Sequence, residues 1–160
     1  MSKSGAGLLL AFLIALPLAA EEPTASPKAA EAGGAQFRDE LQSIETDVIS
    51  KALSLTAEEA TKFWPVFQQF QSEQKAIIDG QIEAVRDYAS HYATMSDEDA
   101  VAYVTALLER DQRIHDLRVK YLAEYSKVLP PGKAARVIHI SRRLGLASQA
   151  KLASEIPLVH

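Results

Sequence analysis

The side chains that most often carry catalysis do not form a recognisable site along this chain. The sequence of 160 residues contains no cysteine, and its serines lie near no histidine in an order typical of a nucleophile and its base. Neither a glycine-rich phosphate loop nor a GxSxG nucleophile elbow occurs. The carboxylates are spread along predicted helix surfaces. The sequence therefore predicts no catalytic residue, and we expect a protein that binds rather than an enzyme.

The histidines are the remaining candidates for chemistry, as metal ligands. They are His91, His115, His139 and His160, and no HxxxH or HExxH pair places two of them on one helix face. His115 and Asp116 are adjacent, so they point to different faces. The sequence predicts neither a metal site nor a cofactor within one chain. A site assembled between chains stays open, and with it a metal-binding sensor as an alternative function.

Two groups of side chains are candidates for contact with another protein. Phe63, Phe67 and Phe70 recur at helical spacing, which favours a buried core. Trp64 lies one step off that stripe, where a partner can use it as an anchor. The basic residues near the C-terminus form either a solvated face or an electrostatic contact for acidic partners. The contact residues that we predict are Trp64, Arg136, Arg142 and Arg143.

Hydrophobic periodicity predicts helices from Gln36 onward, because apolar residues recur at steps of three and four. The inward face of the first helix is expected to hold Phe37, Leu41, Ile44 and Val48. Gly145 is a candidate stop for the last helix, although the residues that follow it can resume helix before the closing proline. The expected helices cover residues 36–53, 56–92, 97–129 and 133–145.

Two start signals mark the long helices. Thr56 followed by Glu59 is a capping box, in which each side chain bonds the backbone amide of the other residue. Ser96 is a predicted N-cap, and the acids Asp97, Glu98 and Asp99 follow it in the first turn, where they suit the helix dipole. No segment shows strand alternation. The sequence therefore predicts an all-α fold of four helices.

A short break joins the two long helices, which predicts a long antiparallel helical hairpin. Such a hairpin is too thin to bury both faces of its helices. We expect the remaining surface to be buried in an elongated antiparallel dimer or left as a binding surface. The polar residues Gln74, Gln81 and Asp111 interrupt the apolar stripes near the middle of the hairpin. They either fix the register or mark a thin part of the core.

The N-terminal residues are typical of a secretory signal peptide. Lys3 gives a short basic start, and Leu8 to Leu16 form an apolar stretch that is too short to span a bilayer as a helix. Small residues precede Glu21, so we place cleavage after Ala20. A retained transmembrane anchor is the alternative. With no cysteine to carry a lipid and no twin-arginine motif, the sequence predicts a soluble periplasmic protein that is exported unfolded.

This signal sets the predicted domain organisation. Residues 1–20 are the signal peptide, and residues 21–35, rich in Pro, Ala, Gly and Glu, are expected to form a disordered leader. Residues 36–148 form the helical domain, and residues 149–160 a C-terminal tail. The formal net charge of −4 at pH 7 argues against a protein that binds nucleic acid.

The helix layout and one short motif resemble the Spy/CpxP family of periplasmic stress proteins, whose LTxxQ signature occurs twice, each time at a helix start. Leu55, Thr56 and Glu59 match the first copy, with glutamate in place of glutamine. Either side chain completes a capping box, so the change is physically mild. The second copy would run from Leu129 to Lys133, where only the leucine and the position at a helix start survive.

This resemblance, over about residues 36–144, implies an ATP-independent chaperone or an envelope-stress regulator. Members of that family form cradle-shaped antiparallel dimers that hold unfolded clients, and some damp a sensor kinase or bind zinc or other heavy metals. Our leading hypothesis is a periplasmic holdase chaperone, or stress-response binding protein, whose partners are unfolded or partly folded envelope proteins and a second copy of the chain. The alternatives are a periplasmic heavy-metal-binding sensor and a regulator of a membrane stress sensor.

Overall fold

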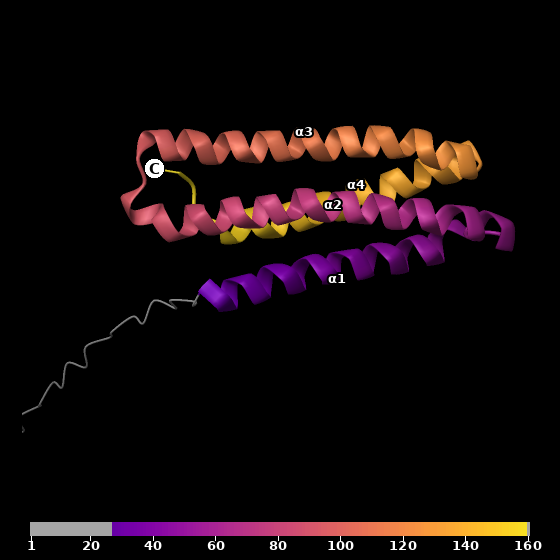
Figure 1. Ribbon diagram of the computed structural model, residues 1–160, viewed down its shortest axis with the longest axis horizontal. Helices are drawn as coiled ribbons and strands as arrows, with labels where there is room; N and C mark the ends of the chain where they lie inside the picture. Colours follow the sequence, from indigo (N-terminus) through magenta and orange to yellow (C-terminus); the bar gives the residue numbers. More distant parts are fainter. Residues whose placement is uncertain (1–26, 160) are drawn as a thin grey trace, which may run out of the picture.

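The computed structural model describes residues 27–159 and shows a bundle of α-helices (Figure 1). In chain order the elements are α1 (Pro27–Leu53), α2 (Ala57–His91), the 3-10 turn η1 (Tyr92–Thr94), α3 (Asp97–Val128) and α4 (Pro131–Glu155). No strand occurs in this part of the chain. The predicted all-α class with four helices is confirmed. The predicted signal peptide and its cleavage after Ala20 lie outside the described residues.

Both predicted start signals form at the long helices. At α2, the Thr56 hydroxyl accepts from the Glu59 amide at 3.2 Å, and the Glu59 carboxylate accepts from the Thr56 amide at 2.8 Å. At α3, the Ser96 hydroxyl accepts from the Asp99 amide at 3.1 Å, and the Asp99 carboxylate accepts from the Ser96 amide at 3.2 Å. These bonds satisfy amides that the first turn of a helix leaves unpaired. They fix the residue at which each long helix begins.

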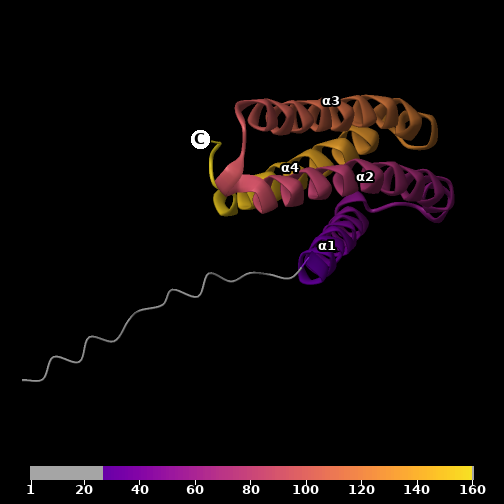
Figure 2. The same ribbon diagram turned by 60° about the vertical axis from the view of Figure 1, so that its left-hand side comes forward.

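The long helices α2 and α3 lie side by side over most of their length and run in opposite directions (Figure 1). Phe63, near the start of α2, contacts Tyr125, near the end of α3, with ring centroids 5.4 Å apart. Tyr88, near the end of α2, stacks on Tyr103 of α3 at 4.0 Å. The helix α4 returns along this pair, and α1 lies outside, in contact with both α2 and α4 (Figure 2).

The core is dominated by aromatic residues at one end of the bundle. The predicted burial of Phe63, Phe67 and Phe70 is confirmed, because each is at most 1% exposed. Their rings pack against Tyr121 and Tyr125 of α3. Aliphatic side chains from α1, α4 and the link before α4 complete this end of the core, namely Ile49, Leu53, Leu129, Ala134 and Val137.

The helix α1 begins earlier than predicted. Residues 27–35, which belong to the predicted disordered leader, are helical. Proline fits the first position of a helix, and the alanines that follow Pro27 have the highest helix propensity. The prediction of disorder for residues 27–35 is therefore wrong. A lack of large apolar residues limits tertiary packing but does not prevent helix formation.

The inward face of α1 is also rotated from the prediction. Ile44 and Val48 are 41% and 37% exposed, whereas Glu45 and Ile49 are buried. Apolar periodicity fits both faces almost equally well, and packing against α2 and α4 together selects the face that carries Glu45. The prediction for Ile44 and Val48 is therefore wrong. On α3, Asp111, which was predicted to interrupt the apolar stripe, is exposed and lies outside it.

The helix α4 continues past Gly145 to Glu155. Residues 149–155 of the predicted tail are therefore helical. Gly145 does not stop the helix, because no glycine in the described residues adopts the positive φ that a C-terminal glycine cap requires. Beyond α4, the backbone carbonyl of Pro157 accepts a hydrogen bond from the Tyr88 hydroxyl at 3.0 Å. The C-terminal segment thus packs back against the end of α2.

Candidate functional site

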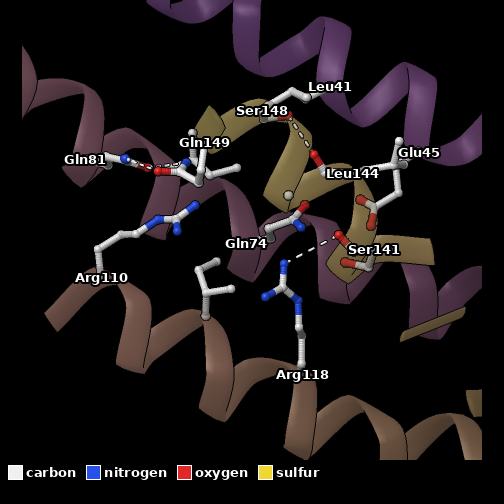
Figure 3. A pocket seen from close by; sticks show the side chains of 13 residues that line it. Leu41, Glu45, Gln74, Gln81, Arg110, Arg118, Ser141, Leu144, Ser148 and Gln149 are labelled. Carbon is white, nitrogen blue, oxygen red and sulfur yellow. Dashed lines mark hydrogen bonds between the residues drawn. The ribbon is translucent and has the colours of Figure 1, made fainter. Parts of the chain in front are cut away.

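A small cavity lies in the interior, where side chains from all four helices meet (Figure 3). Its volume is about 40 Å³. Unlike the aromatic end of the core, this region has polar and charged side chains beside the apolar ones in its lining, and they include Glu45, Gln74, Gln81, Arg110, Arg118 and Ser141. A buried polar region in so small a bundle needs partners for its donors and acceptors, because an unpaired buried group is costly.

Glu45 of α1 is the buried acid of this region. It is only 4% exposed, and burial raises the pKa of its carboxyl group because desolvation disfavours the charged form. The hydroxyl of Ser141 and the charge of Arg118 oppose that shift, as do the amides of Gln71 and Gln74. Two effects therefore oppose each other at this carboxyl group. Burial favours the protonated form, and the nearby cation Arg118 favours the charged form.

Arg118 of α3 approaches this acid from the opposite side of the cavity. Burial lowers the pKa of its guanidinium group, and the charge of Arg110 lowers it further, whereas the charge of Glu45 raises it. Its Nη2 donates a long hydrogen bond of 3.4 Å to the backbone carbonyl of Ser141. Arginine stays protonated in proteins, so Arg110 and Arg118 place two positive charges in this interior (Figure 3).

Several buried polar atoms have no hydrogen-bond partner among the described residues. Three of them belong to this region: Nε of Arg110, Nε of Arg118 and the hydroxyl oxygen of Ser141. Ser141 lies close enough to lower the pKa of Glu45, but the geometry of a hydrogen bond is not met. A buried group without a partner costs about 1–3 kcal/mol, so these three groups lower the free energy of unfolding.

Gln81 and Gln149 close the cavity at its other end with a reciprocal amide pair. Nε2 of Gln81 donates to Oε1 of Gln149 at 2.9 Å, and Nε2 of Gln149 donates back at 3.2 Å. Gln74 and Gln81, two of the three predicted polar interruptions, line the cavity. The third, Asp111, is exposed and pairs with Nη1 of Arg110 at 2.7 Å. The amide pair joins α2 to α4 in a fixed register.

The charged members of this cluster were not among the residues predicted from the sequence. Arg110 offered a signal, because it lies four residues before the buried Ile114 and therefore falls on the inward stripe of α3. Glu45 stands in the same relation to Ile49 on α1. A charged residue at one inward position is equally compatible with the edge of a solvated face, and only the packing of the helices distinguishes the two cases.

The predicted motif residues lie where α1, α2 and α4 meet. Leu55 packs against the core, and Thr56 and Glu59 form the cap. The Glu59 carboxylate also accepts from Nζ of Lys133 at 2.6 Å, and this contact lowers the pKa of Glu59. Lys133 occupies the fifth position of the weaker motif that begins at Leu129. The structure thus brings the fifth positions of the two motif copies into contact.

The predicted contact residues occupy two different environments. Trp64 is half-buried at the edge of the core, with its ring centroid 5.0 Å from that of Phe63 and 5.7 Å from that of Phe67. The three arginines are exposed on α4, and none forms an ion pair within residues 27–159. The surface part of the predicted site is therefore the basic face of α4, with Arg136, Arg142 and Arg143.

A second apolar stripe runs along the outside of α3, on a face that the sequence analysis did not separate from the core face. Val101 and Leu108 are 66% and 64% exposed. Successive members are three, four, eleven and three residues apart, spacings that keep them on one helix face, and the long gap in the middle is a polar interruption. They are Val101, Val104, Leu108, Val119 and Leu122, here called the α3 outer stripe.

Neither a metal centre nor a membrane span is present within residues 27–159. No three His, Asp or Glu side chains there are placed to hold a metal ion, and His91 approaches one acid, Asp87, at 3.2 Å. None of the described helices combines the length and the apolar character that a bilayer span needs. Comparison of the chain with protein-family models, with curated proteins and with solved structures found no significant match.

Two glycine substitutions test the position of Arg118. A Cβ atom at Gly145 would lie 2.6 Å from Nη2 of Arg118, whereas a Cβ atom at Gly80 meets nothing within 4 Å. Alanine is favoured over glycine inside a helix by about 1 kcal/mol. We expect Gly80→Ala to raise the free energy of unfolding by about that amount, and Gly145→Ala to raise it less or lower it because Arg118 must move. Equal gains in urea denaturation would contradict the packing of Arg118 on Gly145.

Lys133→Met tests the ion pair between the two motif positions. The folded-state pKa of Glu59 is lowered, so the contribution of the pair is present at neutral pH and is lost as the pH falls through that lowered pKa. We expect the variant to unfold at a lower temperature than the parent at about pH 7, with a difference that shrinks toward about pH 3. Lys151→Met, at an exposed position on the same helix, is the control. A difference that does not change with pH would exclude this role for Glu59.

Proposed function

We propose that this protein is a periplasmic, ATP-independent holdase or stress-response binding protein of the Spy/CpxP type. The observation that carries the proposal is the exposed apolar surface on several helix faces of a bundle that also has a buried apolar core. Large apolar side chains at least 37% exposed occur on α1, α3 and α4, with Ile44, Val48, Leu108 and Leu146 among them. Contiguous exposed apolar surface marks sites of protein interaction.

The contact between the motif positions gives independent support to the family resemblance. The LTxxQ pattern has glutamine at both fifth positions, whereas this chain has Glu59 at one and Lys133 at the other. Nζ of Lys133 lies 2.6 Å from Oε2 of Glu59. The two departures from glutamine therefore place opposite charges in contact. In this chain the start of α2 and the start of α4 are joined by a pair of opposite charges.

The client surface that we propose combines the basic face of α4 with the apolar residue beside it. Arg136, Arg143 and Leu146 are separated by seven and three residues, so they share one face of α4. Exposed guanidinium groups without ion pairs attract acidic segments, and Leu146, 54% exposed, offers apolar contact. Such a surface fits unfolded segments that carry both apolar and acidic residues. Contacts that are weak individually allow the client to leave without ATP.

The α3 outer stripe fits a second copy of this chain, because four of its five residues are arranged symmetrically about the midpoint between Asp111 and Gln112. Two α3 helices packed antiparallel across a two-fold axis at that midpoint would bring each of these four residues against its counterpart. The stripe extends for about 32 Å at 1.5 Å per residue, and an elongated antiparallel dimer follows. The pairs at equal distance from the midpoint are Val101 with Leu122, Val104 with Val119, and Leu108 with His115.

A triple variant tests the client surface. Arg136→Ser, Arg142→Ser and Arg143→Ser together should raise several-fold the dose that prevents aggregation of a reduced, negatively charged client, because electrostatic attraction is lost. Light scattering measures the aggregation, with the chain lacking residues 1–20. The control combines Lys51→Ser, Arg113→Ser and Lys127→Ser, which remove the same charge from exposed positions on α1 and α3. If the parent protein at an equimolar dose leaves aggregation unchanged, the holdase proposal fails.

Val104→Glu tests the dimer. It places a charge within the α3 outer stripe, opposite Val119 of the second copy, and it should convert a dimer to a monomer in light-scattering mass measurements. The side chain is exposed in one chain, so circular dichroism and the unfolding midpoint of the monomer should stay unchanged. Ala102→Glu, at an exposed position on another face of α3, is the matched control and should leave the mass unchanged. A monomeric parent, or equal effects of both substitutions, would exclude this interface.

A further inference from the structure

We propose that the interior cavity is a binding site for a small inorganic anion, held between the guanidinium groups of Arg110 and Arg118. The proposal concerns an interior that the client surface does not use. A failure of the holdase proposal would therefore leave the anion site unaffected, and a failure of the anion site would leave the holdase proposal unaffected. It accounts for the unpartnered donors of this region, for its two cations and for its size.

Each of the two arginines supplies a charged donor, its Nε, that has no hydrogen-bond partner among the described residues. They lie eight residues apart on α3, hence on one face of the helix and about 12 Å apart along its axis. Both side chains extend from α3 toward α4, into the polar region (Figure 3). The side chain of Arg110 is 12% exposed, and Nε of each arginine is buried without a partner. Guanidinium groups form their strongest hydrogen bonds with anions.

Ser141 adds a neutral donor from the opposite helix. It is 2% exposed, and its hydroxyl oxygen has no hydrogen-bond partner. A hydroxyl group rotates freely to donate, so an anion in the cavity would receive bonds from α3 and α4 together. The polar atoms of this set that lack a partner are two guanidinium Nε groups and one hydroxyl oxygen. The cluster is therefore built for an anion and not for a metal cation.

The size of the cavity limits the ligand to a small ion. A volume of about 40 Å³ exceeds the roughly 10–15 Å³ that one water requires. It is far below the roughly 300–1,000 Å³ of sites for organic ligands. A halide or a small oxyanion fits this range, alone or with a water molecule. Asp111 pairs with Arg110 from outside, so Glu45 is the one acid that lines the cavity beside the two guanidinium groups.

Glu45 is the natural competitor of such an anion, because its carboxylate faces the same cations from α1. Protonation of Glu45 removes that competition, so proton uptake and anion binding should favour each other. The anion should then bind more tightly as the pH falls through the raised pKa of this carboxyl group. The groups that act on Glu45 or on its cation are Gln71 and Gln74 of α2, Arg110, Asp111, Arg118 and Tyr125 of α3, and Ser141 and Arg142 of α4.

Thermal unfolding with chloride as the probe tests the site. Chloride replaces gluconate at constant ionic strength, so general screening stays the same. We expect a saturable rise in Tm of about 3 °C, with half-saturation at lower chloride near pH 5 than near pH 8. Broadening of the chloride-35 resonance by the protein gives a second measure, independent of stability. A Tm that does not depend on chloride, together with an unbroadened resonance, would overturn the proposal and leave a water-filled cavity.

Two variants connect the response to named side chains. Glu45→Gln removes the competing charge at nearly constant shape, and it should tighten chloride binding several-fold and abolish its pH dependence. Arg110→Met removes one charged donor and should abolish the saturable response, whereas Arg113→Met, exposed on another face of α3, should leave it intact. If Arg110→Met does not fold, Glu45→Gln decides, because an unchanged chloride affinity in that variant contradicts the site. An unchanged response in folded Arg110→Met contradicts it equally.

Discussion

The packing of aromatic rings between α2 and α3 is the interaction on which the rest of this bundle depends. The chain has no cysteine, so no disulfide limits its unfolded state, and packing must supply its stability. Phe63, Phe67 and Phe70 extend in a row along α2 and meet Tyr121 and Tyr125 of α3. Such ring pairs contribute about 0.5–1.5 kcal/mol each beyond the area that they bury. They also fix the register of α2 against α3.

The core does not stay apolar along the bundle, and this change explains the layout of α1 and α4. Between the aromatic end and the stacked pair of Tyr88 and Tyr103, the interior is occupied by Glu45, two arginines and several amides. Apolar burial gives little directional preference, whereas hydrogen bonds and charges do. The reciprocal pair of Gln81 and Gln149 and the charge contact of Glu45 with Arg118 select one alignment of the outer helices. Burying these polar groups lowers the stability of the bundle, but their bonds restrict the helices to that alignment.

The parts of this structure that were predictable from sequence are those that local chemistry decides. The capping residues Thr56 and Ser96 mark the starts of the long helices, and regular spacing places the three phenylalanines in the core. The parts that were missed depend on neighbours distant in sequence. Glu45 and Ile44 are one residue apart on a helix whose pattern fits either face, and contact with α2 and α4 decides between them. Gly145 lies inside α4, and the local sequence around it does not show this. The cavity requires residues from four helices.

The attachment of α1 differs between its two halves, and this difference determines how the helix can open. Its last turns are fixed by the apolar residues Ile49 and Leu53. Its earlier turns are held by polar contacts, among them the ion pair of Arg38 with Asp79 and the bond that the Gln42 side chain donates to the carbonyl of Gln71 at 2.8 Å. Water can replace such contacts, so local opening there exposes little apolar surface. The amides of these earlier turns should exchange with solvent through a local fluctuation that salt promotes, while those of the last turns wait for global unfolding.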